Sequence, residues 1–127
     1  MHLETKIANG NGVVPITNGS SLTDDRQTAK RMSVIIPAFN EELAVAETVL
    51  ELRRMFEGTD IKAEIIIVDD GSKDATAREA RAAGARVIQH KNNRGYGASL
   101  KTGILAASND VIAITDADGT YPAKYLP

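Results

Sequence analysis

Apolar runs rich in valine and isoleucine recur along this chain, and a polar turn and a segment of helical spacing follow each of the first three. The runs lie at residues 33–36, 64–69, 86–89 and 110–115. Short runs of this composition are typical of strands that are buried on both faces of a parallel sheet. Because parallel neighbours need a long crossover, the intervening segments are expected to be helices. The pattern predicts an α/β fold with a mostly parallel sheet of about four strands and helices on both faces.

Three segments between these runs have the spacing of helices. The first is expected to begin at Asn40, a suitable N-cap, and to end at Gly58. Its apolar face is formed by Val45, Val49, Leu52 and Phe56. An alanine-rich second helix is expected over 74–83. A third, after a glycine-containing loop at 92–97, is expected over 98–107.

The alternation of strands and helices is absent from the first part of the chain. Residues 1–31 are rich in asparagine, glycine and serine without a strand or helix period, so we expect a flexible polar tail there. Residues 32–127 are expected to form one domain, because a chain of 127 residues has no room for two. Residues 121–127 look like the start of a further element, so we expect the domain to be truncated.

Charge and composition exclude several classes of partner. The formal net charge of −2 gives no overall attraction to nucleic acid, so no nucleic-acid partner is expected. The absence of cysteine excludes disulfides and thiolate metal sites. We find no membrane span or secretory signal and expect a cytoplasmic protein, membrane-associated only through parts that this chain lacks. The oligomeric state is left open.

Polar clusters follow three of the predicted strands at the point where each strand ends. They lie at residues 37–41, 69–72 and 116–119. In open α/β sheets the ligand crevice lies beyond the carboxyl ends of the strands, where side chains distant in sequence converge. The sequence therefore predicts one binding site at this edge of the sheet.

Asp116 and Asp118 form the cluster best suited to a metal ion. Two carboxylates flank one small residue, and their hard oxygen atoms suit Mg²⁺ or Mn²⁺. Such ions typically complete their coordination with water and substrate phosphate, so an anionic substrate is indicated. The alternative is an ordinary Asp-Gly turn after a strand.

The other two clusters offer contacts for a nucleoside. Asp69 and Asp70 can accept hydrogen bonds from a base N–H or from ribose hydroxyls, although Asp70 could instead cap the following helix. Pro37, Phe39 and Glu41 could form the wall and floor of a site for a ring. The alternative for Phe39 is a loop anchor packed on the core.

The glycine-containing loop at 92–97 is suited to a phosphate. Glycines allow close backbone approach, the following helix terminus favours anions, and Arg94 and Lys101 add positive charge. Leu100 stands where both the dinucleotide-binding motif and the P-loop require glycine, so neither motif is complete. His90 has no partner at metal-ligand spacing and is expected at the surface, and no Ser-His-Asp set can be assembled by spacing.

Four motifs, in this order, resemble those of the family 2 glycosyltransferases of GT-A fold. Within that family, the chain is most similar in appearance to the dolichyl- or polyprenyl-phosphate mannosyl- and glucosyltransferases. The motifs are VIIPAFNE at 34–41, IVDDGSKD at 67–74, NRGYGA at 93–98 and DADG at 116–119. The resemblance covers residues 32–127. It implies a Rossmann-like GT-A half-domain, because members of the family continue well beyond the last motif.

The resemblance implies that the chain binds a UDP- or GDP-sugar through Mg²⁺ or Mn²⁺ held by Asp116 and Asp118. The sugar is expected to pass, with inversion, to an acceptor such as a polyprenyl or dolichyl phosphate, and the catalytic base is expected beyond residue 127. The residues expected at the nucleotide-sugar are Pro37, Phe39, Glu41, Val68, Asp69, Asp70, Arg94, Lys101, Asp116, Ala117 and Asp118.

Two alternatives belong to other classes. The DADGT sequence at 116–120 also matches the nucleophile motif of haloacid-dehalogenase-like phosphatases, with Asp116 as the covalent nucleophile. A half-domain could also bind a nucleotide or a partner protein without turnover. Sugar transfer would identify the transferase, and release of inorganic phosphate would identify the phosphatase.

Overall fold

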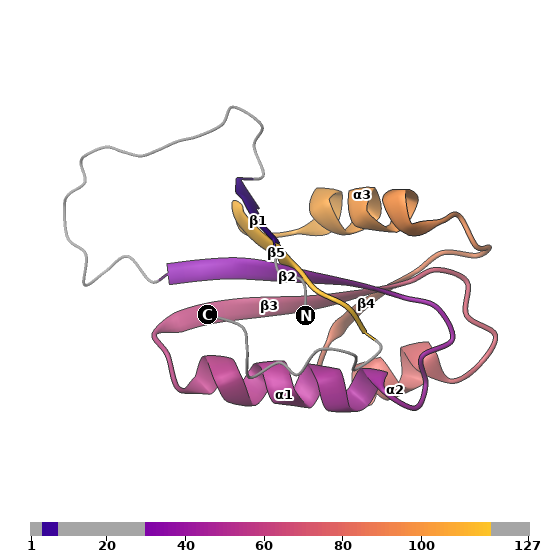
Figure 1. Cartoon of the computed structure of the whole chain (residues 1–127), viewed down its shortest axis with the longest axis horizontal. Helices are drawn as coiled ribbons and strands as arrows, with labels where there is room; N and C mark the ends of the chain where they lie inside the picture. Colours follow the sequence, from indigo (N-terminus) through magenta and orange to yellow (C-terminus); the bar gives the residue numbers. More distant parts are fainter. Residues whose placement is uncertain (1–3, 8–29, 118–127) are drawn as a thin grey trace.

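The protein is an α/β sandwich built on one twisted sheet (Figure 1). The computed structural model describes residues 4–7 and 30–117, with side chains for the second range. The strands are β1 (Glu4–Ile7), β2 (Lys30–Ala38), β3 (Ile61–Asp69), β4 (Arg86–Gln89) and β5 (Val111–Ile114), in the sheet order β1-β5-β2-β3-β4. Strands β2, β3, β4 and β5 run parallel to one another, and β1 pairs antiparallel with β5. The predicted α/β fold with a mostly parallel sheet is confirmed.

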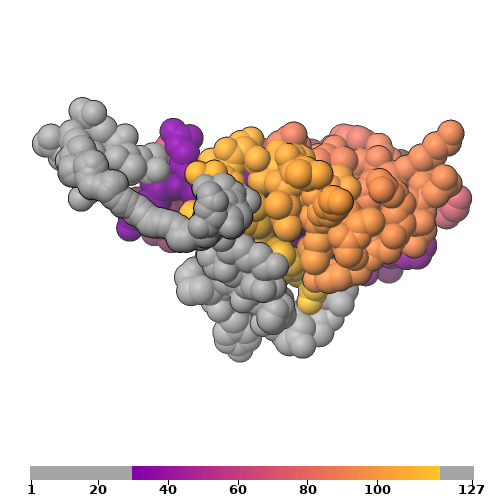
Figure 2. Space-filling model, turned by 90° about the horizontal axis from the view of Figure 1, so that it is seen from above, coloured from indigo at the N-terminus to yellow at the C-terminus, as the bar shows by residue number. Residues whose placement is uncertain are grey.

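Helices cover both faces of the sheet (Figure 1). Helices α1 (Val45–Glu57) and α2 (Thr76–Ala82) lie on one face, and α3 (Tyr96–Ala106) lies on the other. Seen from the side of α3 in Figure 2, this helix and the residues leading into β5 form much of the surface. The chain adds β3 and β4 on one side of β2 and then returns through α3 to place β5 on the other side. The strand order therefore reverses at β2, and such a reversal marks the usual place of a ligand crevice.

The alternation of side chains along the strands divides the core into two layers. Val34 and Ile36 belong to the cluster on the α1 and α2 side, whereas Ile35 belongs to the cluster on the α3 side. All three side chains are fully buried, and burial of each stabilises the fold by about 1.5–3 kcal/mol. The same alternation assigns Ile66 and Val68 of β3 to the α3 side. The face of the sheet on which a residue just after a strand lies can therefore be inferred by continuing the alternation of that strand.

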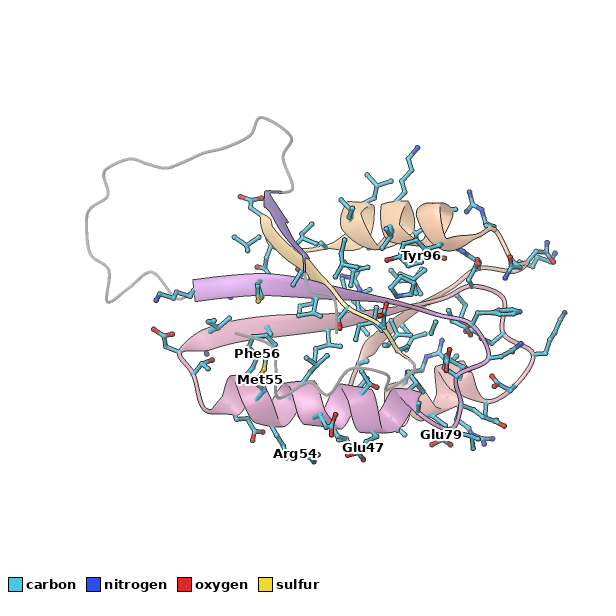
Figure 3. The ribbon with its side chains drawn as sticks, in the orientation of Figure 1. Glu47, Arg54, Met55, Phe56, Glu79 and Tyr96 are labelled. Carbon is cyan, nitrogen blue, oxygen red and sulfur yellow. The ribbon has the colours of Figure 1, made fainter. Side chains whose placement is uncertain are left out.

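Helix α1 shows the same division between buried and exposed faces. Phe56 points from α1 toward the sheet, while Glu47 and Arg54 point away from it (Figure 3). The buried positions of α1 are Val45, Thr48, Val49, Leu52 and Phe56. The apolar residues that predicted this helix are thus its core-facing residues.

Three predicted boundaries are wrong. Residues 4–7, inside the segment expected to be an unstructured tail, form the edge strand β1, and β2 begins at Lys30 rather than after residue 31. Helix α1 begins at Val45, and its N-cap position is Ala44. Asn40 has a left-handed backbone with φ of 54° and uses its side chain to accept a hydrogen bond from the N–H of Lys73. The side-chain oxygen of Asn40 therefore joins the loop after β2 to the loop after β3 instead of capping α1.

Candidate functional site

A pocket of about 320 Å³ opens where β2 and β3 end and α3 begins. Its lining residues come from three segments that are distant in sequence: Pro37, Ala38, Phe39, Asp70, Asn93, Gly95, Tyr96 and Ser99. The predicted convergence at the carboxyl ends of the strands therefore brings Pro37, Phe39 and Asp70 together. Asn93, Tyr96 and Ser99 line the same pocket. The first two belong to the motif at 93–98, but none of the three was among the residues expected at the nucleotide-sugar.

Two aromatic side chains line this pocket and are exposed. Phe39 is 45% exposed and Tyr96, in the first turn of α3 (Figure 3), is 58% exposed. The third aromatic residue of the described ranges, Phe56, is buried in the core. Large rings left in contact with water at a concave site are suited to a flat apolar ligand group. The pocket thus combines aromatic walls with polar groups from Asp70 and Asn93.

The register of the sheet places the residues that follow β2, β3 and β4 side by side. Ala38 pairs with Asp69, and Asp69 pairs with Gln89. The ladder continues one step further, because the N–H of Asp70 donates to the carbonyl of Ala38 and the N–H of His90 donates to the carbonyl of Asp69, both at 2.8 Å. Asp70 and His90 therefore come next to each other at this edge.

Asp70 is a buried carboxylate that holds the loop before α3. Its Oδ1 accepts from the N–H of Arg94 and its Oδ2 from the N–H of Gly95, both at 2.8 Å. Its Oδ1 also lies 2.8 Å from Nδ1 of His90. Burial raises the pKa of Asp70, but these hydrogen bonds outweigh it and hold the pKa below its ordinary value. The side chain does not cap α2, the alternative considered from the sequence.

Asp69 and Val68 are less accessible than the sequence suggested. Asp69 is 2% exposed, and its Oδ1 accepts from the N–H of Ser72, three residues further along the turn, at 2.9 Å. One of its carboxylate oxygens is therefore committed to the turn. The side chain of Val68 is fully buried in the α3-side cluster, so it acts as a core residue.

Reciprocal hydrogen bonds join the loop after β2 to the loop after β3. The N–H of Asn40 donates to Oγ of Ser72, and the N–H of Glu41 donates to Oγ1 of Thr76, each at 2.8 Å. The N–H of Ala75 donates to a carboxylate oxygen of Glu42 at 2.9 Å. These bonds fix the backbone that follows Phe39, at Asn40 and Glu41. Glu41 is half-buried and does not line the pocket.

The loop from Asn93 to Gly95 packs directly on the turn after β3. Gly71 has a φ of 82°, and a Cβ atom there would lie 2.7 Å from the nitrogen of Asn93. Only glycine lets the two backbones approach so closely. Arg94 belongs to this loop through its backbone, and its side chain is exposed. Lys101 is exposed on α3 and does not line the pocket.

His90 is buried rather than at the surface, so that prediction is wrong. It is 9% exposed, and its Nε2 lies 2.8 Å from Oγ1 of Thr102 on α3. With Asp70 on Nδ1, the ring joins the end of β3 to the middle of α3. Spacing could not reveal this set, because its members lie on different elements. The available signal was the position of His90 directly after a strand, at the same edge as Asp70.

Asp116 lies at the same edge, on the other side of β2. The N–H of Thr115 donates to the carbonyl of Ile35 at 3.2 Å, which continues the pairing of β5 with β2 toward Asp116. Asp116 is half-buried but does not line the pocket, and Ala117 packs in the α1-side cluster. Asp118 lies outside the described residues, so its predicted pairing with Asp116 stays a prediction.

The described part of the chain contains neither a cluster of side chains arranged for a metal ion nor a helix suited to a membrane. Within residues 4–7 and 30–117, no group of three or more His, Asp or Glu side chains is arranged to hold a metal ion. A site shared by Asp116 and Asp118 extends beyond these ranges. No helix in the same ranges has the length and apolar character needed to cross a bilayer.

Similar curated proteins align with most of this chain, and the chain spans about a third to two fifths of their length. A dolichyl-phosphate hexose transferase of Haloferax volcanii is 40% identical over 96 residues, covering 76% of this chain and 40% of the relative. A dolichyl-phosphate beta-glucosyltransferase of Dictyostelium discoideum is 35% identical over 105 residues, covering 73% of this chain and 32% of the relative.

A solved structure and a family model agree with these relatives. Glucosyl-3-phosphoglycerate synthase from Mycobacterium tuberculosis, crystallised with Mn²⁺, UDP-glucose and phosphoglyceric acid, matches with a TM-score of 0.59 and 27% identity. The match covers 73% of this chain and 35% of that one. The model of glycosyl transferase family 2 matches residues 33–127, which include all four sequence motifs. The chain therefore belongs to glycosyl transferase family 2.

Proposed function

We propose that this chain forms the donor-binding part of a glycosyltransferase that uses a UDP- or GDP-sugar and Mg²⁺ or Mn²⁺. The sugar would pass, with inversion, to an acceptor such as a polyprenyl or dolichyl phosphate. The observation that carries the proposal is the pocket lined by Phe39 and Tyr96, which opens at the strand ends, on the same edge of the sheet as Asp116. Relatives named as dolichyl-phosphate transferases support the choice of acceptor.

The pocket suits the nucleoside part of the donor. Phe39 and Tyr96 offer aromatic faces to a base, and Pro37 supplies an apolar wall. Asn93 offers an amide that can both donate and accept hydrogen bonds. The carboxylate of Asp70 already accepts from His90, Arg94 and Gly95, so its part in binding is to hold this wall in place.

The alternation along β5 supports a place for Asp116 on the same side as the pocket. Ile112 and Ile114 pack on the α3 side, whereas Ala113 and Ala117 pack on the α1 side. By this alternation we expect the carboxylate of Asp116 on the α3 side, where Pro37 and Asp70 line the pocket. A half-buried carboxylate at this edge fits a hard divalent cation.

Asp116 and Asp118 would hold the cation against the diphosphate. When bound, a divalent cation stabilises the negative charge that develops on the leaving nucleoside diphosphate. Without it, two aspartates and a diphosphate would repel each other, by about 4 kcal/mol for one charge pair at 4 Å and an effective dielectric constant of about 20. The family match supports this function over the phosphatase alternative, which would use Asp116 as a nucleophile.

The test is thermal unfolding of the chain with UDP or GDP, with and without Mn²⁺. A ligand at about 100 times its Kd adds about 2.7 kcal/mol of stability. We expect a higher Tm only when nucleotide and cation are both present, and loss of the increase in Asp118→Asn. Asp110→Asn is the matched control, because Asp110 is exposed and does not line the pocket. Equal stabilisation by nucleotide with and without Mn²⁺ would contradict the metal role.

A further inference from the structure

His90 connects the pocket wall to helix α3 through its two ring nitrogens. Nδ1 lies 2.8 Å from Oδ1 of Asp70, and Nε2 lies 2.8 Å from Oγ1 of Thr102. The side chains of His90 and Asp70 are only 5% and 7% exposed. His90 does not line the pocket, whereas Asp70 does. His90 can therefore influence the pocket through Asp70, which lines it, or through Thr102, which lies on the helix that begins with Tyr96.

The hydrogen bonds fix the tautomer of His90. An ionised carboxylate can only accept hydrogen bonds, so Nδ1 carries the proton that is shared with Asp70. In the neutral ring Nε2 is then an acceptor, and the hydroxyl of Thr102 donates to it. With a partner at each nitrogen, the ring is held in one orientation between β4 and α3.

Asp70 transmits this orientation to the loop before α3. The Oδ1 atom that faces His90 also accepts from the N–H of Arg94, and Oδ2 accepts from the N–H of Gly95. Gly95 and the next residue, Tyr96, line the pocket. A rotation of the Asp70 carboxylate would break both backbone bonds and release the wall that carries the Tyr96 ring.

We propose that His90 is a positioning residue for the nucleotide pocket. By holding the Asp70 carboxylate in the rotamer that receives the N–H groups of Arg94 and Gly95, it sets the place of Tyr96. The inference rests on the proposed function, since it assumes that this pocket binds the donor nucleotide. It assigns His90 a role in donor affinity without any contact between His90 and the ligand.

Two substitutions of His90 separate this role from simple packing. In His90→Asn, the amide nitrogen lies near the place of Nδ1 and can still donate to Asp70. In His90→Gln, the longer side chain places its amide near Nε2, which keeps the contact with Thr102 and loses the one with Asp70. Both variants reduce the size of the side chain, so loss of packing alone predicts no preference for asparagine.

The experiment measures two quantities in the 127-residue chain. The first is hydrogen exchange of the Arg94 and Gly95 amides without ligand. The second is the Kd for UDP or GDP with Mn²⁺. In His90→Gln we expect exchange at both amides to be about tenfold faster and the Kd about tenfold higher, the loss of roughly one charge-assisted hydrogen bond. His90→Asn should stay within about threefold of the unmodified chain in both quantities.

The outcomes distinguish failure of this inference from failure of the proposed function. If the unmodified chain binds neither nucleotide, the proposed function fails, while the exchange rates still report whether His90 holds the loop. Faster exchange in His90→Gln with an unchanged Kd would overturn the link between loop and pocket. Equal losses in both variants would leave His90 as a packing residue and overturn the inference.

A measurement on the unmodified chain covers the case in which His90→Gln does not fold. Nitrogen chemical shifts of the His90 ring report the tautomer directly. We expect the Nδ1-protonated form with a slowly exchanging Nδ1 proton. A ring protonated on Nε2 alone would show that Asp70 receives no proton from His90 and would overturn the inference.

Discussion

Phe39, directly after β2, and Tyr96, the first residue of α3, line the same pocket although the whole β3-α2-β4 unit separates them in sequence. Both rings are exposed, so neither contributes much to the core. Their shared position follows from the parallel sheet, which brings strand ends and the start of a following helix to one edge. Substitutions of these two residues can therefore change ligand binding without much change in the stability of the fold.

Replacing either ring with alanine should weaken nucleotide binding and leave stability nearly unchanged. Stacking of a base on an aromatic ring contributes about 1–3 kcal/mol, so Phe39→Ala and Tyr96→Ala should each raise the Kd for UDP or GDP by about tenfold or more. Calorimetric titration in the presence of Mn²⁺ would measure the change. Leu105→Ala is the control on α3, because Leu105 is 76% exposed and does not line the pocket. Unchanged affinity in both ring variants would rule out base stacking in this pocket.

Two glycines near the pocket should respond to alanine in opposite ways. Gly71 has a φ of 82°, and a Cβ there would lie 2.7 Å from the nitrogen of Asn93 and 2.8 Å from the carbonyl carbon of Asn92. Backbone atoms cannot move aside as a flexible side chain can, so Gly71→Ala should lower the free energy of unfolding by about 1–3 kcal/mol. Gly97 lies in α3, and apart from its chain neighbours and the backbone of the helix itself no heavy atom lies within 4 Å of a Cβ at that position.

Gly97→Ala should therefore raise the free energy of unfolding by up to about 1 kcal/mol, because alanine is a better helix former than glycine. Urea unfolding of both variants beside the unmodified chain would measure the two effects. A neutral result for Gly71→Ala would show that the turn after β3 and the loop at 92–93 are not in tight contact.

The buried carboxylate of Asp70 should make the free energy of unfolding depend on pH. Burial raises its pKa, and the hydrogen bonds from His90, Arg94 and Gly95 lower it further than burial raises it. A carboxyl whose pKa is lower in the folded state stabilises the fold fully above its ordinary value of 3.8, and this contribution is lost as the pH falls through the folded-state pKa.

Free energies of unfolding from about pH 6 down to about pH 2 would measure this dependence. We expect Asp70→Asn to be less stable at neutral pH and to lose less stability than the unmodified chain as the pH falls. The carboxyl of Glu64 also has a lowered pKa, because hydrogen bonds from Ser108, Ser33 and Arg86 outweigh its burial, and it remains in both proteins. Parallel pH curves for the two proteins would contradict the role of Asp70.

The α/β fold could be predicted from the sequence because the core strands are apolar runs that do not also show the spacing of a helix. The sequence was insufficient for β1, since residues 4–7 pair with β5 across more than a hundred positions and their composition is largely polar. The start of α1 was misplaced for a related reason. The side chain of Asn40 satisfies the N–H of Lys73 in another loop instead of a helix end.

The lining of the pocket could be predicted to the extent that its residues follow strands, and their part in binding stays a prediction. Pro37, Phe39 and Asp70 were found in this way and do line one pocket. Tyr96 was missed because it belongs to a helix start, where sequence analysis considered only the glycines and charges. His90 was missed because its partners, Asp70 and Thr102, become neighbours only after β3, β4 and α3 have packed together.

We propose that a divalent cation held at Asp116 lies next to a nucleotide bound in the pocket that Phe39 and Tyr96 line. Mn²⁺ is paramagnetic, so amide signals close to it broaden in a proton–nitrogen correlation spectrum. With UDP or GDP present, we predict that substoichiometric Mn²⁺ broadens the amides of residues 115–117 and of the pocket first, and that Asp118→Asn removes this effect. Broadening centred on the exposed acidic residues Glu42 or Asp110 instead would contradict the claim.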